Sequence, residues 1–408
     1  MPTDYSVAAL TEYEIRSIRE CQIPPRVDVA TLKQTLRSSG PQGRVEPFTL
    51  VKDPTAWTAA QFQGSGDHIY WLTPADIAEI DTALALVEDQ GLEIKAVTKD
   101  QFPLPRLGPQ LSELQRNVTF GRGFQLIKGL AVDKYTRRQV LIIWKAFGLY
   151  WGALRPMNKR GHMITHVTNI EKEPLESSRG YTSADAITWH NDNADIVALL
   201  CLTVPKGGGG VSSFASGIAI HNELLKRGRQ DLVEELAASG WYRPRTGWNE
   251  APKVDDGRSF EEKYYSLPIF NYHQGYLSVS YEGPQYFRVH KDSSAPRLTE
   301  KQAEALAMFS ALAASDELRM DTIFEPGTIQ MLHNPTCVHF RSQVHDGEAE
   351  GQRRHLLRIW VAPAEDRPIP ALFAHTWGGS TEVGKRGGWF LEEGVEPWFP
   401  EQPVMGDL

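Results

Sequence analysis

The chain has 408 residues, of which 41% are hydrophobic and 23% charged, and its formal net charge at pH 7 is −8. This length allows one large domain or two ordinary ones, and the composition is that of a soluble globular protein. Because binding of nucleic acid or of an anionic membrane requires a basic face, we expect neither among the partners of this protein.

The cysteines and the N-terminal sequence predict a cytoplasmic protein. Cys21, Cys201 and Cys337 form no CxxC pair and no framework spacing, which suits a reducing compartment. The first residues, MPTDYSVAALTEYEIRSIRE, lack the basic stretch and apolar core of a secretory signal. The longest apolar runs are too short to span a membrane.

Helices are predicted at four places along the chain. Residues 1–65 are mixed in character and are expected to form an N-terminal extension that packs on the main fold. The first helix begins after Thr73, a suitable N-cap, with Pro74 at the first helical position. Apolar residues at three- and four-residue spacing predict the others at 134–148, at 217–227 and from Thr299, which forms a capping-box pattern with Gln302.

Strands are predicted mainly after residue 160. The β-prone runs are 164–170, 194–204, 268–281, 327–334, 336–344 and 353–363. They do not alternate regularly with helices, so a doubly wound parallel sheet is not expected. We predict an α+β fold, a double-stranded β-helix (jelly roll) with flanking helices, over residues 66–365. Residues 366–408, rich in Gly, Pro and Trp, are expected to form an irregular C-terminal segment.

His190 and Asp192, in TWHNDNADIV, are candidate metal ligands. Side chains two residues apart in an extended strand point to the same face, so the imidazole and the carboxylate would project together. Such a pair is also explained by a hydrogen bond at a strand edge, and a third ligand is therefore needed. His339 completes the two-histidine, one-carboxylate set of non-heme Fe(II) oxygenases, although zinc with a bound water could use the same ligands.

A strand near the C-terminal end of the predicted domain carries arginines that could bind an anion. Arg354 and Arg358 are four residues apart, so they share one face of a strand. A guanidinium that is half-buried there favours a bidentate pair with a carboxylate. Taken alone, these two arginines are equally compatible with surface or ion-pair roles. Arg353 is interpreted as a solvated charge beside the preceding turn.

Other residues near these motifs have simpler explanations. The GGGG at 207–210 is interpreted as a turn, because no Lys-Ser/Thr follows it. His221 lies on an amphipathic helix, and His333 and His345 rank below His339 as ligands. Trp189 and Cys337 point away from the ligand face by strand parity and are interpreted as packing residues.

Several motifs in the same order resemble those of one enzyme family. They are WHNDNADIVALLCL, GGGGVSSFASGIAIHNEL, FNYHQGYLSV, FEPGTIQMLHNPTCVHFR and RRHLLRIWVAP. Together they resemble the TauD/TfdA-like (taurine dioxygenase, clavaminate synthase-like) Fe(II)/2-oxoglutarate dioxygenases, and especially their fungal branch. The resemblance covers roughly residues 100–365.

The resemblance implies roles for individual residues. It implies His190, Asp192 and His339 as iron ligands and Arg354 as the partner of the distal carboxylate of 2-oxoglutarate. Arg358 matches a position that contacts the near carboxylate or an anionic substrate. Ser212 matches a Thr that bonds a 2-oxoglutarate carboxylate. Ser213 is an equally near candidate, because the acidic residue that usually lies between the glycines and this Thr is absent.

The resemblance therefore predicts an oxygenase with Fe(II) as cofactor and 2-oxoglutarate and O2 as co-substrates. It would oxidise an unactivated C–H bond of a small molecule by hydroxylation, desaturation or ring formation and release succinate and CO2. Arg358 suits an anionic group on that substrate, and a homo-oligomer is compatible with the sequence. The alternatives are a zinc-dependent hydrolase that uses the same three ligands and a metal-free binding protein on a jelly-roll scaffold.

Overall fold

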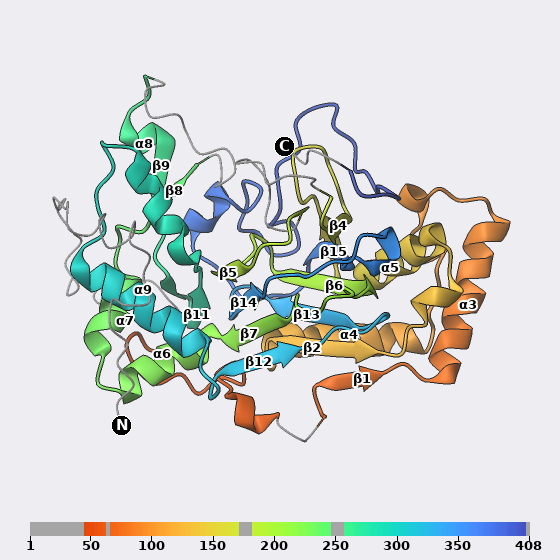
Figure 1. The fold of residues 1–408 in the computed structure, drawn as a ribbon, viewed down its shortest axis with the longest axis horizontal. Helices are drawn as coiled ribbons and strands as arrows, with labels where there is room; N and C mark the ends of the chain where they lie inside the picture. The colour runs from red at the N-terminus through yellow and green to blue at the C-terminus, as the bar shows by residue number, and fades with distance from the viewer. Residues whose placement is uncertain (1–44, 63–65, 171–181, 246–256, 405–408) are drawn as a thin grey trace.

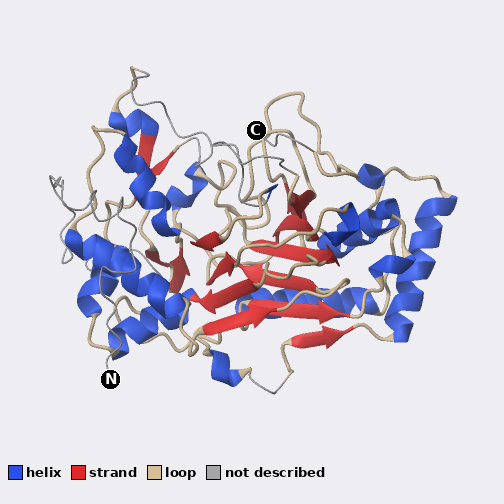
Figure 2. Cartoon of the chain, in the orientation of Figure 1, coloured by secondary structure: helices blue, strands red, loops and turns tan. Residues whose placement is uncertain are grey.

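The computed structural model describes residues 45–62, 66–170, 182–245 and 257–404, which Figure 1 draws in colour. Two β-sheets lie at its centre, and helices gather at both ends of the long axis (Figure 2). The expected α+β fold, a jelly-roll core with flanking helices, is confirmed.

The larger sheet has seven strands in the order β1-β2-β13-β6-β15-β3, and β4 also pairs with β15. All its pairs are antiparallel except β1 with β2. Its strands are β1 (Ile69–Trp71), β2 (Phe124–Lys128), β3 (Ala153–Arg155), β4 (Thr165–Thr168), β6 (Ile196–Thr203), β13 (Ile329–His333) and β15 (His355–Ala362).

The smaller sheet has four strands in the order β12-β7-β14-β5, and all its pairs are antiparallel. Its strands are β5 (Ile187–His190), β7 (Ser212–Ser216), β12 (Arg319–Thr322) and β14 (Cys337–Arg341). Two short hairpins stand apart from both sheets and pair β8 (Tyr242–Pro244) with β9 (Tyr264–Ser266) and β10 (Phe270–His273) with β11 (Tyr276–Val279).

The helices form two groups. The first packs against the outer face of the larger sheet and comprises α3 (Pro74–Asp89), α4 (Leu107–Phe120) and α5 (Arg137–Trp151). The second packs beside the smaller sheet and comprises α6 (Gly217–Lys226), α7 (Gln230–Ala237) and α9 (Glu300–Ala313). The short α8 (Phe260–Lys263) precedes β9, and the 3-10 helices are η2 (Ala59–Gln61), η3 (Ile94–Ala96), η4 (Val132–Lys134), η7 (Gly283–Lys291), η8 (Glu350–Gln352) and η9 (Ala371–His375).

Local capping sets the starts of the predicted helices. The hydroxyl of Thr73 accepts from the backbone N–H of Asp76 at the start of α3, and Thr299 forms the expected capping box with Gln302. The helix predicted at 134–148 instead begins at Arg137, because Thr136 is its N-cap and pairs with Gln139. The expected strand runs contain β4, β6, β10, β11, β13, β14 and β15. The elements that were not predicted are β1, β2, β3, β7, β8, β9, β12, α4, α7 and α8.

Segments at both ends of the described chain contribute to the interior. Trp57 is 1% exposed, and its ring centroid lies 4.9 Å from that of Phe124 in β2. Residues 1–44 of the predicted extension lie outside the described residues. Near the C-terminus, Arg386 is fully buried and its guanidinium lies 2.7 Å from the carboxylate of Asp195.

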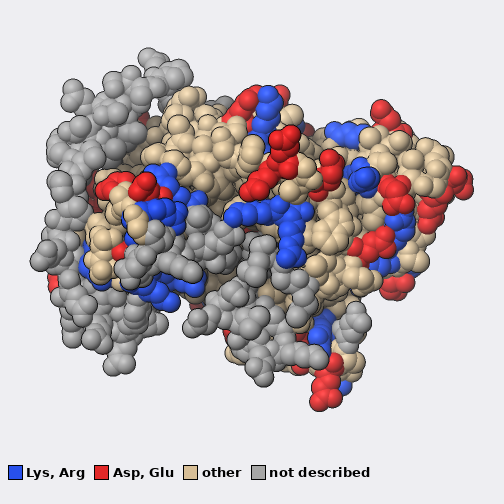
Figure 3. Space-filling model, turned by 90° about the horizontal axis from the view of Figure 1, so that it is seen from above, with Lys and Arg blue, Asp and Glu red and all other residues tan. Residues whose placement is uncertain are grey.

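On the face drawn in Figure 3, the described residues form no large patch of a single charge. Lys and Arg side chains lie interspersed with Asp and Glu over the part of that face that the described residues form. Within the described chain, no helix is long and apolar enough to cross a membrane.

Candidate active site

The two candidate histidine ligands meet because β5 and β14 are neighbours in the smaller sheet. His190, the last residue of β5, pairs directly with His339 in β14. Residues directly opposite in an antiparallel pair present their side chains on the same face, and the two ring centroids lie 4.2 Å apart. The sheet register thus places both imidazoles at one point on its inner face.

Asp192 reaches the same point from outside any strand. Residues 191–195 cross from β5 in one sheet to β6 in the other, so the expectation of one extended strand through His190 and Asp192 is wrong. The side chain of Asn191 is buried and donates to the carbonyl oxygens of Asn334 and Cys337. The amide oxygen of Asn334 in turn accepts from the backbone N–H of Asp192 at 3.0 Å. These bonds, rather than strand pleating, hold Asp192 beside the histidines.

The three side chains form a compact ligand set. Each offers one ligand atom, and these atoms all lie within 4.8 Å of one another. The Nδ1 atom of His190 lies 2.7 Å from the carbonyl oxygen of Thr188, which leaves Nε2 for a metal. His339 has a buried Nδ1 with no hydrogen-bond partner among the described residues. The set fits a divalent cation such as Fe(II).

The protonation states also suit a divalent metal. Burial lowers the pKa of His339 to about 3 and also lowers the pKa of His190. Burial alone would raise the pKa of Asp192, but Arg358 and the two histidines lower it below its usual value. At neutral pH the site therefore presents two neutral imidazoles and one carboxylate, the forms in which these groups bind metals.

Strand β15 brings the predicted arginines to the same interior. Arg354 immediately precedes β15. As the spacing predicted, one face of this strand carries every second side chain, namely Arg354, Leu356, Arg358 and Trp360. The guanidinium of Arg358 lies 3.5 Å from the carboxylate of Asp192, with both side chains 11% exposed. Arg358 is therefore next to the ligand set.

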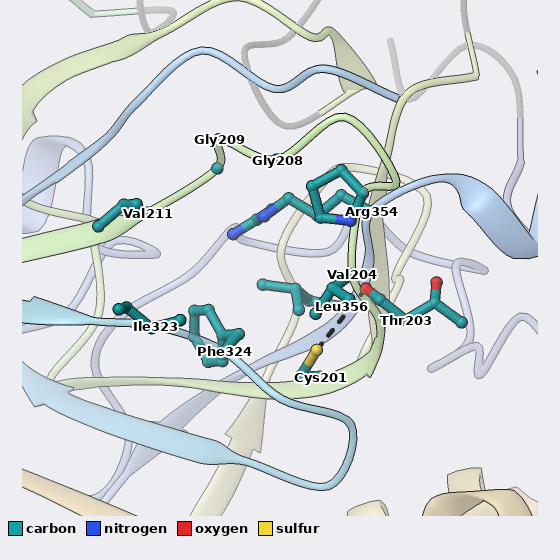
Figure 4. A pocket seen from close by; sticks show the side chains of 12 residues that line it. Cys201, Thr203, Val204, Gly208, Gly209, Val211, Ile323, Phe324, Arg354 and Leu356 are labelled. Atoms are coloured by element: carbon teal, nitrogen blue, oxygen red, sulfur yellow. Dashed lines mark hydrogen bonds between the residues drawn. The ribbon is translucent and has the colours of Figure 1, made fainter. Parts of the chain in front are cut away.

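Arg354 lies further along the same face, in a cavity of about 300 Å³. Figure 4 shows its side chain extending between the Gly208–Gly209 turn on one side and Phe324 on the other. Arg354 is 5% exposed. The carboxylate of Asp346 accepts from its backbone N–H at 2.7 Å and acts on its charge, but no carboxylate of the described residues lies within ion-pair distance of its guanidinium. Burial lowers its pKa to about 9, with a further decrease caused by Arg341, so the guanidinium remains charged at neutral pH. A buried guanidinium whose own donors pair with no carboxylate of the described residues suits an anionic ligand.

The two serines occupy different environments. Ser212 pairs with Arg341 across β7 and β14, and its buried hydroxyl donates to the amide oxygen of Gln330 at 2.9 Å. Ser213 points to the other side of β7 and donates to Asp321 at 2.6 Å. Ser212, rather than Ser213, is therefore on the strand face that carries His339.

The remaining histidine candidates are separate from the site. His221 is fully buried, with its Nε2 atom 2.7 Å from the hydroxyl of Tyr272. His333 is fully buried beside Asp366, and His345 is exposed. Trp189 and Cys337 are buried in hydrophobic clusters, as expected for packing residues. The expectation that Cys337 points away from the ligand face is wrong, because Cys337 lies two residues before His339 in β14 and therefore on the same face.

Sequence reasoning missed several residues that shape the site. The indole N–H of Trp360 donates to the carboxylate of Asp192 at 3.1 Å. Gly210 has a φ of +67°, and a Cβ atom there would lie 2.6 Å from Cδ of Arg354. Strand parity with Arg358 could have identified Trp360, whereas the role of Gly210 depends on a contact between distant segments.

Comparisons with known proteins agree with this geometry. Residues 87–360 match the family described as taurine catabolism dioxygenase TauD, TfdA family. FR-33289 synthase of Streptomyces rubellomurinus is 30% identical over 342 residues, which are 81% of this chain and 96% of that protein. Taurine hydroxylase-like protein SAT17 of Stachybotrys chartarum is 29% identical over 374 residues, which are 86% of this chain and 88% of that protein.

Two solved structures show the same fold. Asparagine oxygenase in complex with Fe(II), 3-hydroxyasparagine and succinate has a TM-score of 0.53 and 18% identity and covers 72% of this chain and 93% of its own. The non-heme iron oxygenase OrfP in complex with Fe and alpha-ketoglutaric acid has a TM-score of 0.50 and 14% identity, with the same coverage of 72% and 93%. The family match gives no support to a zinc hydrolase or a metal-free binding protein. The chain therefore belongs to the taurine dioxygenase TauD/TfdA family of Fe(II)- and 2-oxoglutarate-dependent dioxygenases.

Proposed function

We propose that His190, Asp192 and His339 hold the iron and that Arg354 binds the distal carboxylate of 2-oxoglutarate. The observation that carries this proposal is the convergence of the three ligand atoms within 4.8 Å beside the arginine-bearing face of β15. Bound Fe(II) supplies the O2 and C–H chemistry, coupled to oxidation of 2-oxoglutarate to succinate and CO2. The protein supplies the ligands, the orientation and the exclusion of water.

Each chain residue has a defined task in this proposal. The carbonyl oxygen of Thr188 fixes the orientation of the His190 ring through Nδ1. Arg354 offers a charged, planar donor group to a carboxylate in the cavity that it shares with Phe324 and the 208–210 turn. Ser212 is the weaker contact for the co-substrate, because its hydroxyl already donates to Gln330.

The substrate we propose is a small molecule with an anionic group, oxidised at an unactivated C–H bond. Arg358 lies beside Asp192, and the charges of Asp192, Arg358 and Arg341 all act on His190, so two cations face one carboxylate near the ligands. Hydroxylation is favoured because one relative is named taurine hydroxylase-like and one solved structure holds 3-hydroxyasparagine with succinate. We place the enzyme in the cytoplasm, since its few cysteines form no disulfide-type pattern.

The test is anaerobic titration of the apo protein with Fe(II) and then 2-oxoglutarate, followed by the visible metal-to-ligand charge-transfer band of the chelate. Arg354→Met should raise the 2-oxoglutarate concentration needed for half of the band by about a hundredfold, because a charged hydrogen-bonded pair contributes about 3 kcal/mol. Arg353→Met is the matched control, since the hydrogen bonds of the Arg353 guanidinium within the described ranges go to the backbone carbonyls of Asn169 and Glu348, each at 3.4 Å. Absence of the band in the wild-type protein would overturn the proposed site.

A further inference from the structure

The indole of Trp360 makes a direct hydrogen bond to a proposed iron ligand. Its Nε1 atom lies 3.1 Å from Oδ2 of Asp192, and the Trp360 residue is 6% exposed. The same oxygen lies 3.5 Å from the guanidinium of Arg358 and 4.0 Å from Nε2 of His339. Two donors from one strand face therefore converge on one carboxylate oxygen.

Asp192 needs such donors because of where it lies in the fold. It belongs to the 191–195 crossing between the sheets, so no strand ladder fixes its side chain. Its backbone is held by Asn334, but that bond leaves the two side-chain torsions of the aspartate free. An indole N–H is a donor only and does not titrate, so it offers the carboxylate one fixed direction at every working pH.

Trp360 is itself held in place. It pairs with Val197 of β6 and with Arg155 of β3, so strands flank it on both sides. Its ring packs in the cluster that contains Met157 and Phe214, between the two sheets. The guanidinium of Arg358 lies 5.3 Å from the ring centroid, within the range of a cation–π contact.

We propose that Trp360 is a positioning residue that sets the orientation of the Asp192 carboxylate, and with it the affinity of the site for its metal. This inference rests on the proposed metal ligands. Partners that hydrogen-bond to metal ligands commonly contribute about 10–100-fold to metal affinity or activity. The aromatic ring has a second task, which is to support Arg358, and the two tasks can be separated by substitution.

The experiment measures binding of Mn(II), an O2-stable probe for this ligand set, to the full-length chain from the EPR signal of free Mn(II). Trp360→Phe keeps an aromatic ring beside Arg358 but removes the N–H donor. Replacement of Trp360 by benzothienylalanine keeps the size and shape of the indole and changes only the N–H to sulfur. Trp389→Phe is the matched control, because Trp389 packs against the same cluster, whereas the indole hydrogen bond to Asp192 among the described residues comes from Trp360.

The expected result is a Kd for Mn(II) raised about tenfold by both changes at Trp360, with Trp389→Phe within about twofold of wild type. The Co(II) ligand-field spectrum should shift in the same two variants, whereas far-ultraviolet circular dichroism should not. A wild-type Kd in the benzothienylalanine protein would overturn the inference, because ring packing alone would then suffice. A wild-type chain that fails to bind Mn(II) would instead refute the proposed ligand set, and the role of Trp360 with it.

Discussion

His190 and His339 face each other across β5 and β14, with their ring centroids 4.2 Å apart. The two residues are far apart in the chain, and only the antiparallel register of the smaller sheet brings them together. Asp192 joins them through the crossing to the larger sheet, so the ligand set exists only in the folded chain. Metal binding and folding should therefore be coupled.

The first prediction concerns that coupling. Mn(II) at about 100 times its Kd should raise the free energy of unfolding of the wild-type protein by about 2.7 kcal/mol. His339→Ala should remove most of this increase, because it removes one of three ligands. His345→Ala should retain it, since His345 is exposed and outside the ligand set. Urea unfolding with and without Mn(II) measures the difference, and an equal increase in both variants would contradict the assignment.

The second prediction concerns the turn beside Arg354. Gly210→Ala should raise the Kd for 2-oxoglutarate about tenfold, or about 1.4 kcal/mol, because the new Cβ would lie 2.6 Å from Cδ of Arg354 and displace the guanidinium. Gly208→Ala is a matched control: its φ is also positive, at +82°, but a Cβ there meets nothing within 4 Å. Titration of the charge-transfer band gives both values.

Two results are informative for the same pair of variants. Equal losses in Gly210→Ala and Gly208→Ala would show that backbone strain in the turn, rather than the contact with Arg354, weakens binding. Wild-type affinity in Gly210→Ala would place the distal carboxylate away from Arg354.

The third prediction concerns acid stability. The Nε2 atom of His355, on β15, lies 2.8 Å from the Nδ1 atom of His166. The pKa of His355 is lowered to about 2, mainly by burial and to a smaller extent by His166 and Arg137. Because the folded-state pKa lies below the ordinary histidine pKa of 6.5, the unfolded chain binds one more proton than the folded chain at pH values between the two. The contribution of the buried, neutral His355 to the free energy of unfolding is therefore fully present above pH 6.5, and it is lost as the pH decreases below this value.

His355→Gln should remove this contribution while keeping a hydrogen-bonding group beside His166. The free energy of unfolding of the variant should then fall less steeply than that of the wild type as the pH decreases from 6.5 to 5, and the two slopes should differ by up to about 1.4 kcal/mol per pH unit. The exposed His345, changed to Gln, should leave the wild-type slope unchanged. Chemical denaturation at several pH values measures the slope, and identical slopes for the wild type and His355→Gln would refute the prediction.

The sequence determined the local structure and the chemical types in the site. Capping patterns at Thr73 and Thr299 placed two helix starts, because the stabilising hydrogen bonds join residues only three positions apart. Alternation along 353–363 placed Arg354 and Arg358 on one face, since strand geometry has a period of two. The residue types of His190, Asp192 and His339 were likewise recognisable in the sequence as those of candidate iron ligands.

Only the tertiary structure decided how these groups meet. Asp192 was expected to share a strand with His190, but it lies in a crossing between sheets that Asn334 anchors from a distant segment. The bond from Trp360 to Asp192 and the approach of Gly210 to Arg354 also join residues far apart in the chain. Such contacts depend on sheet register and packing, which local propensity and spacing do not encode, because both act over a few residues.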